Sequence, residues 1–598
     1  MRQFVGWALL FLASGTTVSA NEYFQTKVLA TYKFDAVGKS TVTQRIKLTN
    51  TTTEKYARQF MLSLGDTRIV NITGSDALGP LQILATGSAI TVNFNSPMVG
   101  KKQTQEFVLS YSGPDAKHTG QIWEINVPSA PDPSIVDDYE LHLQIDPALG
   151  HLAFVAPQPR SITNRTYIFT RDQLDEVGVV AAFGNFQTFA FNLKYQLVNS
   201  QNRPVYFEIA LPADTNYQRV FYDDLQPRPA QVSIDEDGNW LARYDLQAAE
   251  KLQITAWGQV HVLAEPNRLL AEPETATQLA KYLQPTHYWP RLETRLKTPQ
   301  EIYNYVVSTL DYDFSHSDHI RLGAAGALAN PGNSVCTEFT DLFIALARSA
   351  GIPAREVNGF AYTADSTSRP LSLARDVLHA WPQYWDPASQ LWINVDPTWE
   401  NTTGGVDYFH KLDFNHFAFV THGVSDVEPL AAGFYKTNEQ QKDVQVDFAI
   451  FKDYPLSDFT MNWQKPWQIF PITNSASNLI LSNASGQAQY NVNIHLTPQN
   501  FQLGSPENFM FTEVPPYGQV HIPIVITKGH FLNFRPQTLI IRTPTQSMTY
   551  NIPASLYLLW NFCVGLIFSA LLIGLAFVAG RTRSVYFQKS KSGYPVHR

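Results

Sequence analysis

Alternating hydrophobic and polar positions dominate the first half of the chain. From residue 21 to about residue 264, short period-two runs such as 41–48 are separated by Gly, Pro, Asn and Asp. Period two with turn residues between the runs predicts β-strands arranged in sandwich modules. We expect two such modules, residues 21–114 and 115–265.

Helical spacing begins after a proline-containing linker and lead-in at 266–297. Thr298 can cap a helix, Pro299 suits the first turn and Glu301 completes a capping box. A single apolar stripe is expected to follow on this helix, made of Ile302, Tyr305, Val306 and Leu310.

A second helix is predicted to begin near Cys336, where Asn333 or Ser334 can act as the cap. Apolar residues follow at helical spacing, and Gly351 is a C-terminal stop signal. Period-two runs return after about residue 425, for example at 490–496, and predict an Ig-like β domain over 426–553.

Both termini carry membrane signals. Residues 1–20 combine Arg2, a short apolar run and a small-residue ending, which predicts a cleaved signal peptide. The uncharged run 556–579 is long enough to span a bilayer, so we expect a transmembrane helix at 556–580. The Lys and Arg residues of the tail 581–598 then place this tail in the cytoplasm and the large body outside it, in the periplasm or at the cell surface.

Composition supports a folded, multidomain chain. With 598 residues, about three or four domains are expected. Hydrophobic residues make up 44% and charged residues 16%, which argues against global disorder. The net charge of −8 and the absence of a markedly basic segment give no sign of a nucleic-acid partner. The oligomeric state is left open.

The chain contains two cysteines, Cys336 and Cys563. Cys563 lies in the predicted span, so we expect no disulfide, and the exported body keeps one thiol in an oxidising compartment. A reactive thiolate is favoured at a helix N-terminus and needs an imidazole partner, itself oriented by a third group. Cys336 has the first of these features.

A predicted hairpin supplies the other two groups. Residues 379–385 and 391–396 read as strands, and Asp-Pro-Ala-Ser at 386–389 has good turn chemistry. A turn centred between residues 387 and 388 would place His379 directly opposite Asp396, with Cβ atoms about 5 Å apart. We therefore expect the carboxylate to hold the imidazole.

These segments resemble the transglutaminase-like superfamily. The resemblance spans roughly residues 298–423 and is carried by NSVCTEF at 333–339, LARSAGIPAR at 346–355, HAW at 379–381 and WINVDPTW at 392–399. It implies a papain-like α/β catalytic domain, which we assign to 298–425. Carried over by position, Cys336 would be the nucleophile, His379 the general acid/base and Asp396 the orienting group. The backbone N–H of Cys336 and the side chain of Tyr312 are candidates for the oxyanion donors.

Other polar clusters are given no role. The acidic and histidine residues within 311–319 show no recognisable ligand spacing and are interpreted as a solvated loop, so neither a metal nor a cofactor is predicted. His410, His416 and His422 form a second cluster that can pack behind the site.

The overall prediction is a multidomain α+β protein that acts as a thiol enzyme on a protein or peptide substrate. Cys336 would attack a peptide or carboxamide carbonyl to form a thioester. Water as acceptor gives a cysteine protease or amidase, which we favour, and an amine acceptor gives a crosslinking transglutaminase. The non-enzymatic alternative is a surface scaffold that binds a partner through its sandwich domains.

Overall fold

A computed structural model describes most of the chain. The described residues are 8–9, 11–13, 16–18, 23–63, 70–86, 89–174, 178–267, 274–315, 320–363, 369–370, 378–404, 406–410, 412–436, 442–464, 474–527, 535–552 and 554–589. They divide into two compact units, one of residues 1–227 and 234–453, the other of residues 228–233 and 454–598.

The first β module runs further than its pattern predicts. Its buried core extends from Phe24 to Phe183 as a single cluster, and β11 shares an eight-stranded sheet with β14. The predicted division at residue 114 is therefore wrong, because a Gly-Pro turn marks a strand connection as readily as a domain boundary. The strands are β4 (Phe24–Phe34), β5 (Ser40–Asn50), β6 (Tyr56–Ser63), β7 (Val70–Asp76), β8 (Gly79–Pro80), β9 (Gln82–Thr86), β10 (Ala89–Val99), β11 (Thr104–Ser112), β12 (Lys117–Thr119), β13 (Ile122–Val127), β14 (Asp138–Ile145), β15 (Leu152–Ala156), β16 (Ser161–Thr163), β17 (Thr166–Thr170) and β18 (Val179–Phe183), with a 3-10 turn at Pro147–Leu149 and helix α1 (Arg171–Leu174).

Three short strands lie within the predicted signal peptide, namely β1 (Ala8–Leu9), β2 (Phe11–Ala13) and β3 (Thr16–Val18). β1 pairs with β6, and β2 pairs with β3. Cleavage after Ala20 stays a prediction; it would remove these three strands and leave the β4–β5 pairing in place.

The second β module contains β19 (Phe186–Val198), β20 (Val205–Leu211), β21 (Gln218–Gln226), β22 (Gln231–Ile234), β23 (Trp240–Leu246) and β24 (Lys251–Leu263). A later strand, β29 (Val444–Phe448), completes the sheet β21-β24-β19-β29. Residues 444–448 thus belong to this module, and the C-terminal β domain begins later than residue 426, where we predicted its start. The pattern of β29 predicts a strand but carries no information about which sheet it joins.

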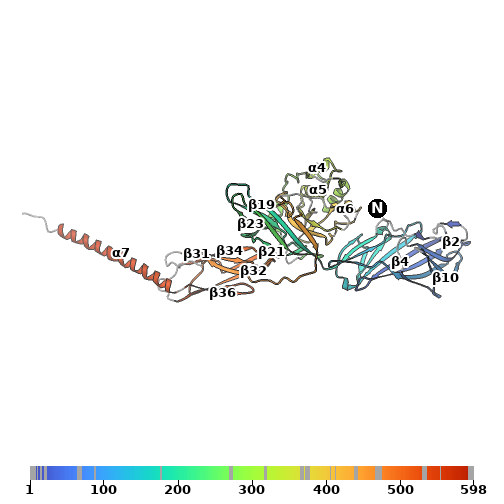
Figure 1. The fold of residues 1–598 in the computed structure, drawn as a ribbon, viewed down its shortest axis with the longest axis horizontal. Coiled ribbons are helices and arrows are strands. Elements are labelled where there is room, and N and C mark those ends of the chain that lie inside the picture. Colours follow the sequence, from blue (N-terminus) through green and yellow to red (C-terminus); the bar gives the residue numbers. More distant parts are fainter. Residues whose placement is uncertain are drawn as a thin grey trace, which may run out of the picture. The chain divides into compact units, whose positions relative to one another are not determined.

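The α+β core lies between these two parts of the second module in the sequence. A four-stranded sheet has the order β27-β26-β25-β28, and helix α5 packs against β25 and β26. Helices α4, α5 and α6 of this core are labelled in Figure 1. The elements are α2 (Ala276–Lys281), α3 (Pro299–Thr309), α4 (Gly323–Ala329), α5 (Cys336–Ser349), β25 (Ala354–Ala361), β26 (Leu378–Asp386), β27 (Leu391–Asn394), α6 (Pro397–Thr403) and β28 (His416–His422). The core cluster already includes Trp289, so this domain begins before the predicted residue 298.

The second unit holds a β-sandwich and a long helix. Sheets β30-β31-β34 and β33-β32-β35-β36 enclose one hydrophobic core. The elements are β30 (Thr460–Gln464), β31 (Ser475–Ser482), β32 (Gln489–Gln499), β33 (Asn508–Val514), β34 (Gln519–Ile526), β35 (Gln537–Arg542), β36 (Ser547–Ile552) and α7 (Ala554–Lys589). The segment 561–582 of α7 is long enough and apolar enough to cross a membrane, as the sequence predicts.

The start of α3 has the predicted chemistry. Thr298 caps the helix, Pro299 occupies its first turn, and Thr298 and Glu301 form the capping box. The apolar stripe differs in one residue, because Tyr303 is buried and Tyr305 is 38% exposed. The helix packs against both α5 and α6, which widens its buried face beyond the predicted stripe.

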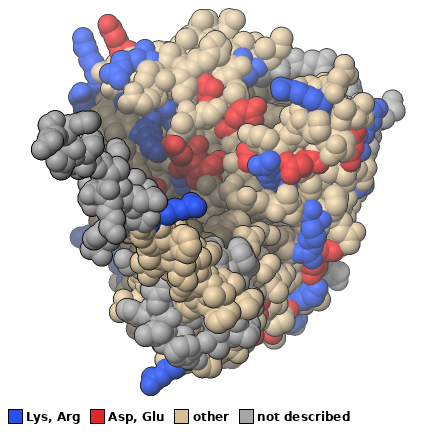
Figure 2. Space-filling model, turned by 90° about the vertical axis from the view of Figure 1, so that its left-hand side faces the viewer, with Lys and Arg blue, Asp and Glu red and all other residues tan. Residues whose placement is uncertain are grey.

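Charged side chains of both signs are mixed on the surface. Figure 2 shows Asp and Glu lying among Lys and Arg on the face that it displays. This mixture agrees with the small net charge of −8. The expected lack of a nucleic-acid partner stays a prediction.

Candidate active site

Cys336 is the first residue of α5, and its side chain is buried. The predicted caps are wrong: neither Asn333 nor Ser334 caps this helix, and Ser334 instead donates to the carbonyl of Pro331 at 3.0 Å. The capping position is Val335, whose N–H donates to Glu338 Oε2 at 3.1 Å. Cys336 thus lies at the positive end of a helix of 14 residues, where a negative charge is stabilised.

Glu338 fixes the start of α5 from within the protein. Its side chain is fully buried, and its second oxygen, Oε1, accepts the N–H of Leu322 at 2.8 Å. Thr337 donates its hydroxyl to Glu338 Oε2 at 3.0 Å. One carboxylate therefore links the first turn of α5 to the segment that enters α4.

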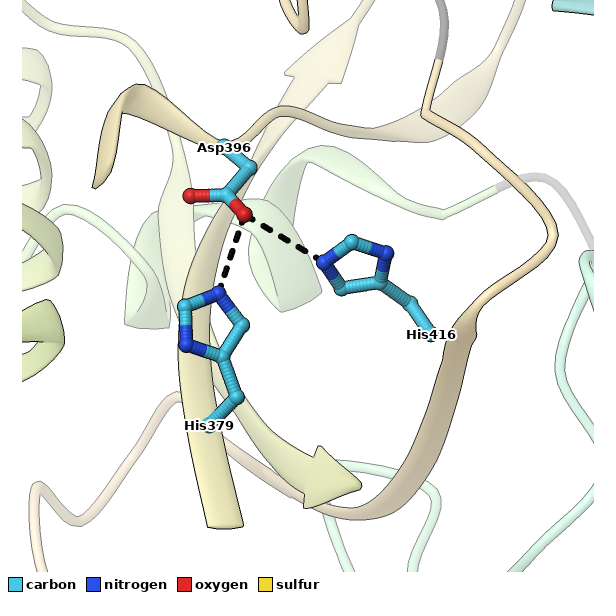
Figure 3. A group of neighbouring side chains, drawn as sticks. All are labelled: His379, Asp396 and His416. Carbon is cyan, nitrogen blue, oxygen red and sulfur yellow. Dashed lines mark hydrogen bonds and ion pairs between the residues drawn. The ribbon is translucent and has the colours of Figure 1, made fainter. Parts of the chain in front are cut away.

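His379 lies near the start of β26, and Asp396 is the N-cap of α6. The two side chains are fully buried, and His379 Nε2 lies 2.9 Å from Asp396 Oδ2 (Figure 3). The other oxygen of Asp396 accepts the N–H of Trp399 at 3.0 Å, which caps α6. Asp396 therefore has a fixed position for two independent reasons.

The contact between His379 and Asp396 is present, but the predicted register is wrong. The hairpin pairs Gln383 with Asn394 and Trp385 with Trp392, a shift of two residues from the expected pairing. The reason is a longer connection, in which Gln390 adopts a positive φ of 55°. Asp396 reaches His379 because the chain leaves the ladder after β27 and turns into α6.

Aromatic rings enclose the imidazole of His379. Trp399 stacks on it with ring centroids 5.1 Å apart, and Trp381 stacks at 6.0 Å. Both tryptophans are buried. They hold the ring plane and exclude water, so a charge on the imidazole is balanced by the protein rather than by solvent.

The electrostatics favour a protonated His379. Burial acts against the charged ring, but the charge and hydrogen bond of Asp396 outweigh it and raise the pKa of His379 to about 9. Cys336 also raises this pKa, through a hydrogen bond and through its charge. Although burial opposes ionisation of Asp396, the two histidines beside it lower the pKa of Asp396 well below its usual range.

His416 is a site residue to which sequence reasoning gave no role. It begins β28, and its Nε2 lies 3.3 Å from the same Asp396 oxygen that contacts His379 (Figure 3). Its Nδ1 lies 2.9 Å from Asp413 Oδ1. The only signal in the sequence is a histidine three residues after an aspartate at the start of a strand, a pattern too common to identify a site.

His379, Asp396 and His416 are also the group, among the described residues, whose ligand atoms could hold a metal ion. These atoms all lie within 4.8 Å of one another. Two imidazoles and one carboxylate suit a transition metal. However, the Nε2 atoms of both histidines already lie at hydrogen-bonding distance from the same Asp396 oxygen. Hydrogen bonds therefore explain why the three side chains lie together, and no metal ion is needed for it.

The other predicted candidates lie elsewhere. His410 is exposed and contacts Asp407 at 2.6 Å, and His422 contacts Asn358 at 3.0 Å and Glu356 at 3.4 Å. Tyr312 forms a β-bridge with Ser334, two residues before Cys336. Residues 316–319 of the predicted solvated loop lie outside the described residues.

A cavity of about 330 Å³ lies next to this cluster. Trp381, Asp413 and His416 form part of its wall, together with residues 215, 217, 218 and 262–266, which lie in or next to strands of the second β module. A small molecule in this cavity would therefore reach the His416 side of Asp396.

The arrangement brings together a thiol, an imidazole and a carboxylate. The carboxylate fixes one ring nitrogen of His379, and the side chain of Cys336 acts on the same ring through a hydrogen bond. A proton can then pass between the thiol and Nδ1, which is the chemistry of a nucleophilic cysteine.

Comparisons with known proteins show what the core domain is similar to. Residues 288–397 match the family model of the transglutaminase-like superfamily. No curated protein matches the sequence significantly. Among solved structures, a protein of Cytophaga hutchinsonii provisionally described as a cysteine protease is 17% identical, with 46% of this chain and 94% of that chain covered and a TM-score of 0.30. The periplasmic domain of TgpA from Pseudomonas aeruginosa, solved with ethylmercury, is 15% identical over 36% of this chain and 91% of that chain, with a TM-score of 0.18.

Proposed function

We propose that this protein, whose residues 288–397 match the family model of the transglutaminase-like superfamily, is a membrane-anchored, extracytoplasmic cysteine hydrolase of peptide or carboxamide bonds. The observation that carries the proposal is the buried hydrogen bond between His379 and Asp396 beside Cys336. Cys336 is also the one cysteine outside the apolar C-terminal helix.

The proposed reaction has two steps. Cys336 gives its proton to His379 and attacks the substrate carbonyl, so that a C–S bond forms. The C–N bond then breaks, and the amine leaves with the proton from His379. In the second step, water attacks the thioester, His379 takes a proton from this water and returns it to the sulfur, and a carboxylic acid is released.

Asp396 would act as the orienting group throughout. Its charge stabilises the imidazolium that exists while the sulfur is anionic, and its capping bond to α6 keeps its own position fixed. The backbone N–H of Cys336, at the N-terminus of α5, is the proposed oxyanion donor.

Membrane anchoring rests on α7. Residues 561–582 have a mean hydropathy of 2.6, and Arg581 and Arg583 follow at the end of the apolar run. The positive-inside rule then puts the catalytic domain outside the cytoplasm. Water is always available there as an acceptor, so hydrolysis is the proposed outcome, and transfer to an amine is the second candidate.

The test uses the full chain in detergent, with Cys563→Ser so that Cys336 is the single thiol. Alkylation by iodoacetamide is measured for this protein and for His379→Ala and Asp396→Asn. We expect both variants to react at least tenfold more slowly at neutral pH. Equal rates in all three, or no reaction of Cys336, would overturn the thiol-enzyme proposal and favour the scaffold alternative.

The acceptor is tested separately, with casein peptides and a fluorescent primary amine. New peptide ends, or glutamine converted to glutamate, indicate hydrolysis, and fluorescence in the peptides indicates transfer; ammonia from a carboxamide is released in both cases. Cys336→Ala is the control, and any product that it forms comes from another enzyme.

A further inference from the structure

We propose that His416 is a positioning residue that remains a buried imidazolium and fixes Asp396 by bridging it to Asp413. This inference rests on the proposed function of Cys336, His379 and Asp396. It concerns how their arrangement is maintained.

The geometry of the two ring nitrogens carries the proposal. Nδ1 of His416 lies 2.9 Å from Asp413 Oδ1, and Nε2 lies 3.3 Å from Asp396 Oδ2. An ionised carboxylate only accepts hydrogen bonds, so both ring nitrogens must carry a proton. A neutral imidazole has one N–H and would leave one of these contacts without a hydrogen.

Burial makes this arrangement specific. The side chains of His416 and Asp396 are 2% and 0% exposed, and that of Asp413 is 10% exposed. A buried cation between two buried anions is tolerated, whereas either anion alone would be costly. The burial of the ring acts against its charge, but the two carboxylates outweigh it and raise the pKa of His416 to about 9.

The groups around His416 come from several elements. His379 on β26 has its ring centroid 5.6 Å away, and Trp381 and Trp399 pack at 4.9 and 4.6 Å. Arg369 acts on Asp413 by charge, and its guanidinium donates to Tyr408 at 2.8 Å. The charges therefore alternate from Asp413 through His416 and Asp396 to His379. Figure 3 draws the last three of these side chains.

His416 should therefore have two opposite effects on the protonation of His379. The positive charge of His416 lies close to His379 and disfavours a second imidazolium there. Its hydrogen bond holds Asp396 in the position that favours that imidazolium. Removal of His416 should therefore slow the chemistry and, at the same time, raise the pH at which His379 loses its proton.

The first experiment measures iodoacetamide alkylation of Cys336 from pH 5 to 10.5, in the full chain with Cys563→Ser. For His416→Ala we expect a rate about 10–100-fold lower and an alkaline limb shifted upward by about one pH unit. The matched control is His410→Ala, because His410 lines the same cavity but is exposed and contacts Asp407 instead. A lower rate without the shift would show a purely structural role and overturn the proposal.

The cavity allows a chemical rescue. Since His416 lines a space of about 330 Å³, imidazole should enter His416→Ala, bridge both carboxylates as imidazolium and restore most of the rate at pH 6.5. The control is 1-methylimidazole, which has only one N–H when protonated and should not rescue. Equal rescue by both, or by neither, contradicts the bridging role.

Three further outcomes keep the alternatives apart. If His416→Ala does not fold, Asp413→Asn retains the imidazole and should shift the alkaline limb in the same direction by a smaller amount; no shift would overturn the proposal. If EDTA slows the parent protein and Zn²⁺ restores it, His416 is a metal ligand and not a bridge. If His379→Ala leaves alkylation unchanged, the proposed function fails; if only His416→Ala leaves it unchanged, this inference fails alone.

Discussion

The imidazole of His379 lies with its Nε2 2.9 Å from Asp396 Oδ2, and neither side chain is exposed to solvent. Because the pKa of His379 is raised to about 9, the imidazolium that accompanies a Cys336 thiolate should persist through neutral pH. We predict an alkaline limb near pH 9 in the profile of alkylation or turnover. A limb near pH 6.5, the ordinary value for histidine, would contradict the pairing.

The same pair should make stability depend on pH. The folded pKa of His379 is above the unfolded one, so its contribution is fully present below about pH 6.5 and is lost as pH rises to about 9. We predict that His379 contributes a fall of roughly 3 kcal/mol in the free energy of unfolding over this interval, as measured by urea unfolding. His379→Ala should remove this part of the fall and leave the part that comes from His416, whose pKa is also raised to about 9. His410→Ala, at an exposed histidine, should keep the slope of the parent protein.

The two oxygens of Asp396 can be separated by substitution. Asparagine retains an oxygen that caps α6 by accepting the N–H of Trp399, whereas alanine retains neither contact. We predict that Asp396→Asn and Asp396→Ala both lose activity by about 10²–10⁴-fold. Asp396→Ala should in addition unfold with about 1 kcal/mol less stability than Asp396→Asn. Equal stability of the two variants would mean that the cap contributes nothing.

Local chemistry allowed much of this site to be predicted. The capping box of α3, the start of α5 at Cys336 and its stop just before Gly351 depend on neighbouring residues, and each is present. The contact of His379 with Asp396 was also expected, although for the wrong reason. The register of the hairpin depends on Gln390, which adopts a positive φ. The turn residues at 386–389 do not indicate this conformation.

Long-range packing could not be predicted in the same way. His416 reaches Asp396 because β28 pairs with β25, and no pattern within β28 selects that neighbour. For the same reason the strand β29 was assigned to the wrong module, and the core from Phe24 to Phe183 was divided in two. The periodicity of a strand indicates which of its faces is buried, but it does not indicate which other strand or module that face packs against.

A buried ionic network behind α5 should be essential for folding. The guanidinium of Arg321 donates to Asp341, and it donates to Glu356 Oε2 and the carbonyl of Asp426, each at 2.9 Å. Both acidic side chains are fully buried. We predict that Arg321→Met costs about 3–5 kcal/mol, because two buried carboxylates lose their counter-ion. This loss is measured by urea unfolding.

The control for this network is Arg243→Met. Arg243 forms an exposed pair with Asp245 at 2.9 Å, and loss of such a pair costs about 0–1 kcal/mol. Similar losses of stability in the two variants would show that burial does not set the strength of the Arg321 network.

Two glutamates occupy the same capping position in different surroundings. Glu301 in α3 is exposed, and Glu338 in α5 is fully buried and accepts N–H groups from Val335 and Leu322 with its two oxygens. Glutamine has one acceptor oxygen, so Glu338→Gln leaves one buried N–H without a partner. We predict a loss of about 1–3 kcal/mol for Glu338→Gln, and of less than about 0.5 kcal/mol for Glu301→Gln, by urea unfolding.

The position of Cys336 gives this comparison a functional readout. Cys336 follows Val335 directly, so a displaced first turn of α5 moves the sulfur relative to His379. Alkylation of Cys336 should therefore slow by about tenfold or more in Glu338→Gln and stay unchanged in Glu301→Gln. If Glu338→Gln loses stability but keeps the parent alkylation rate, Glu338 supports the fold without setting the position of the thiol.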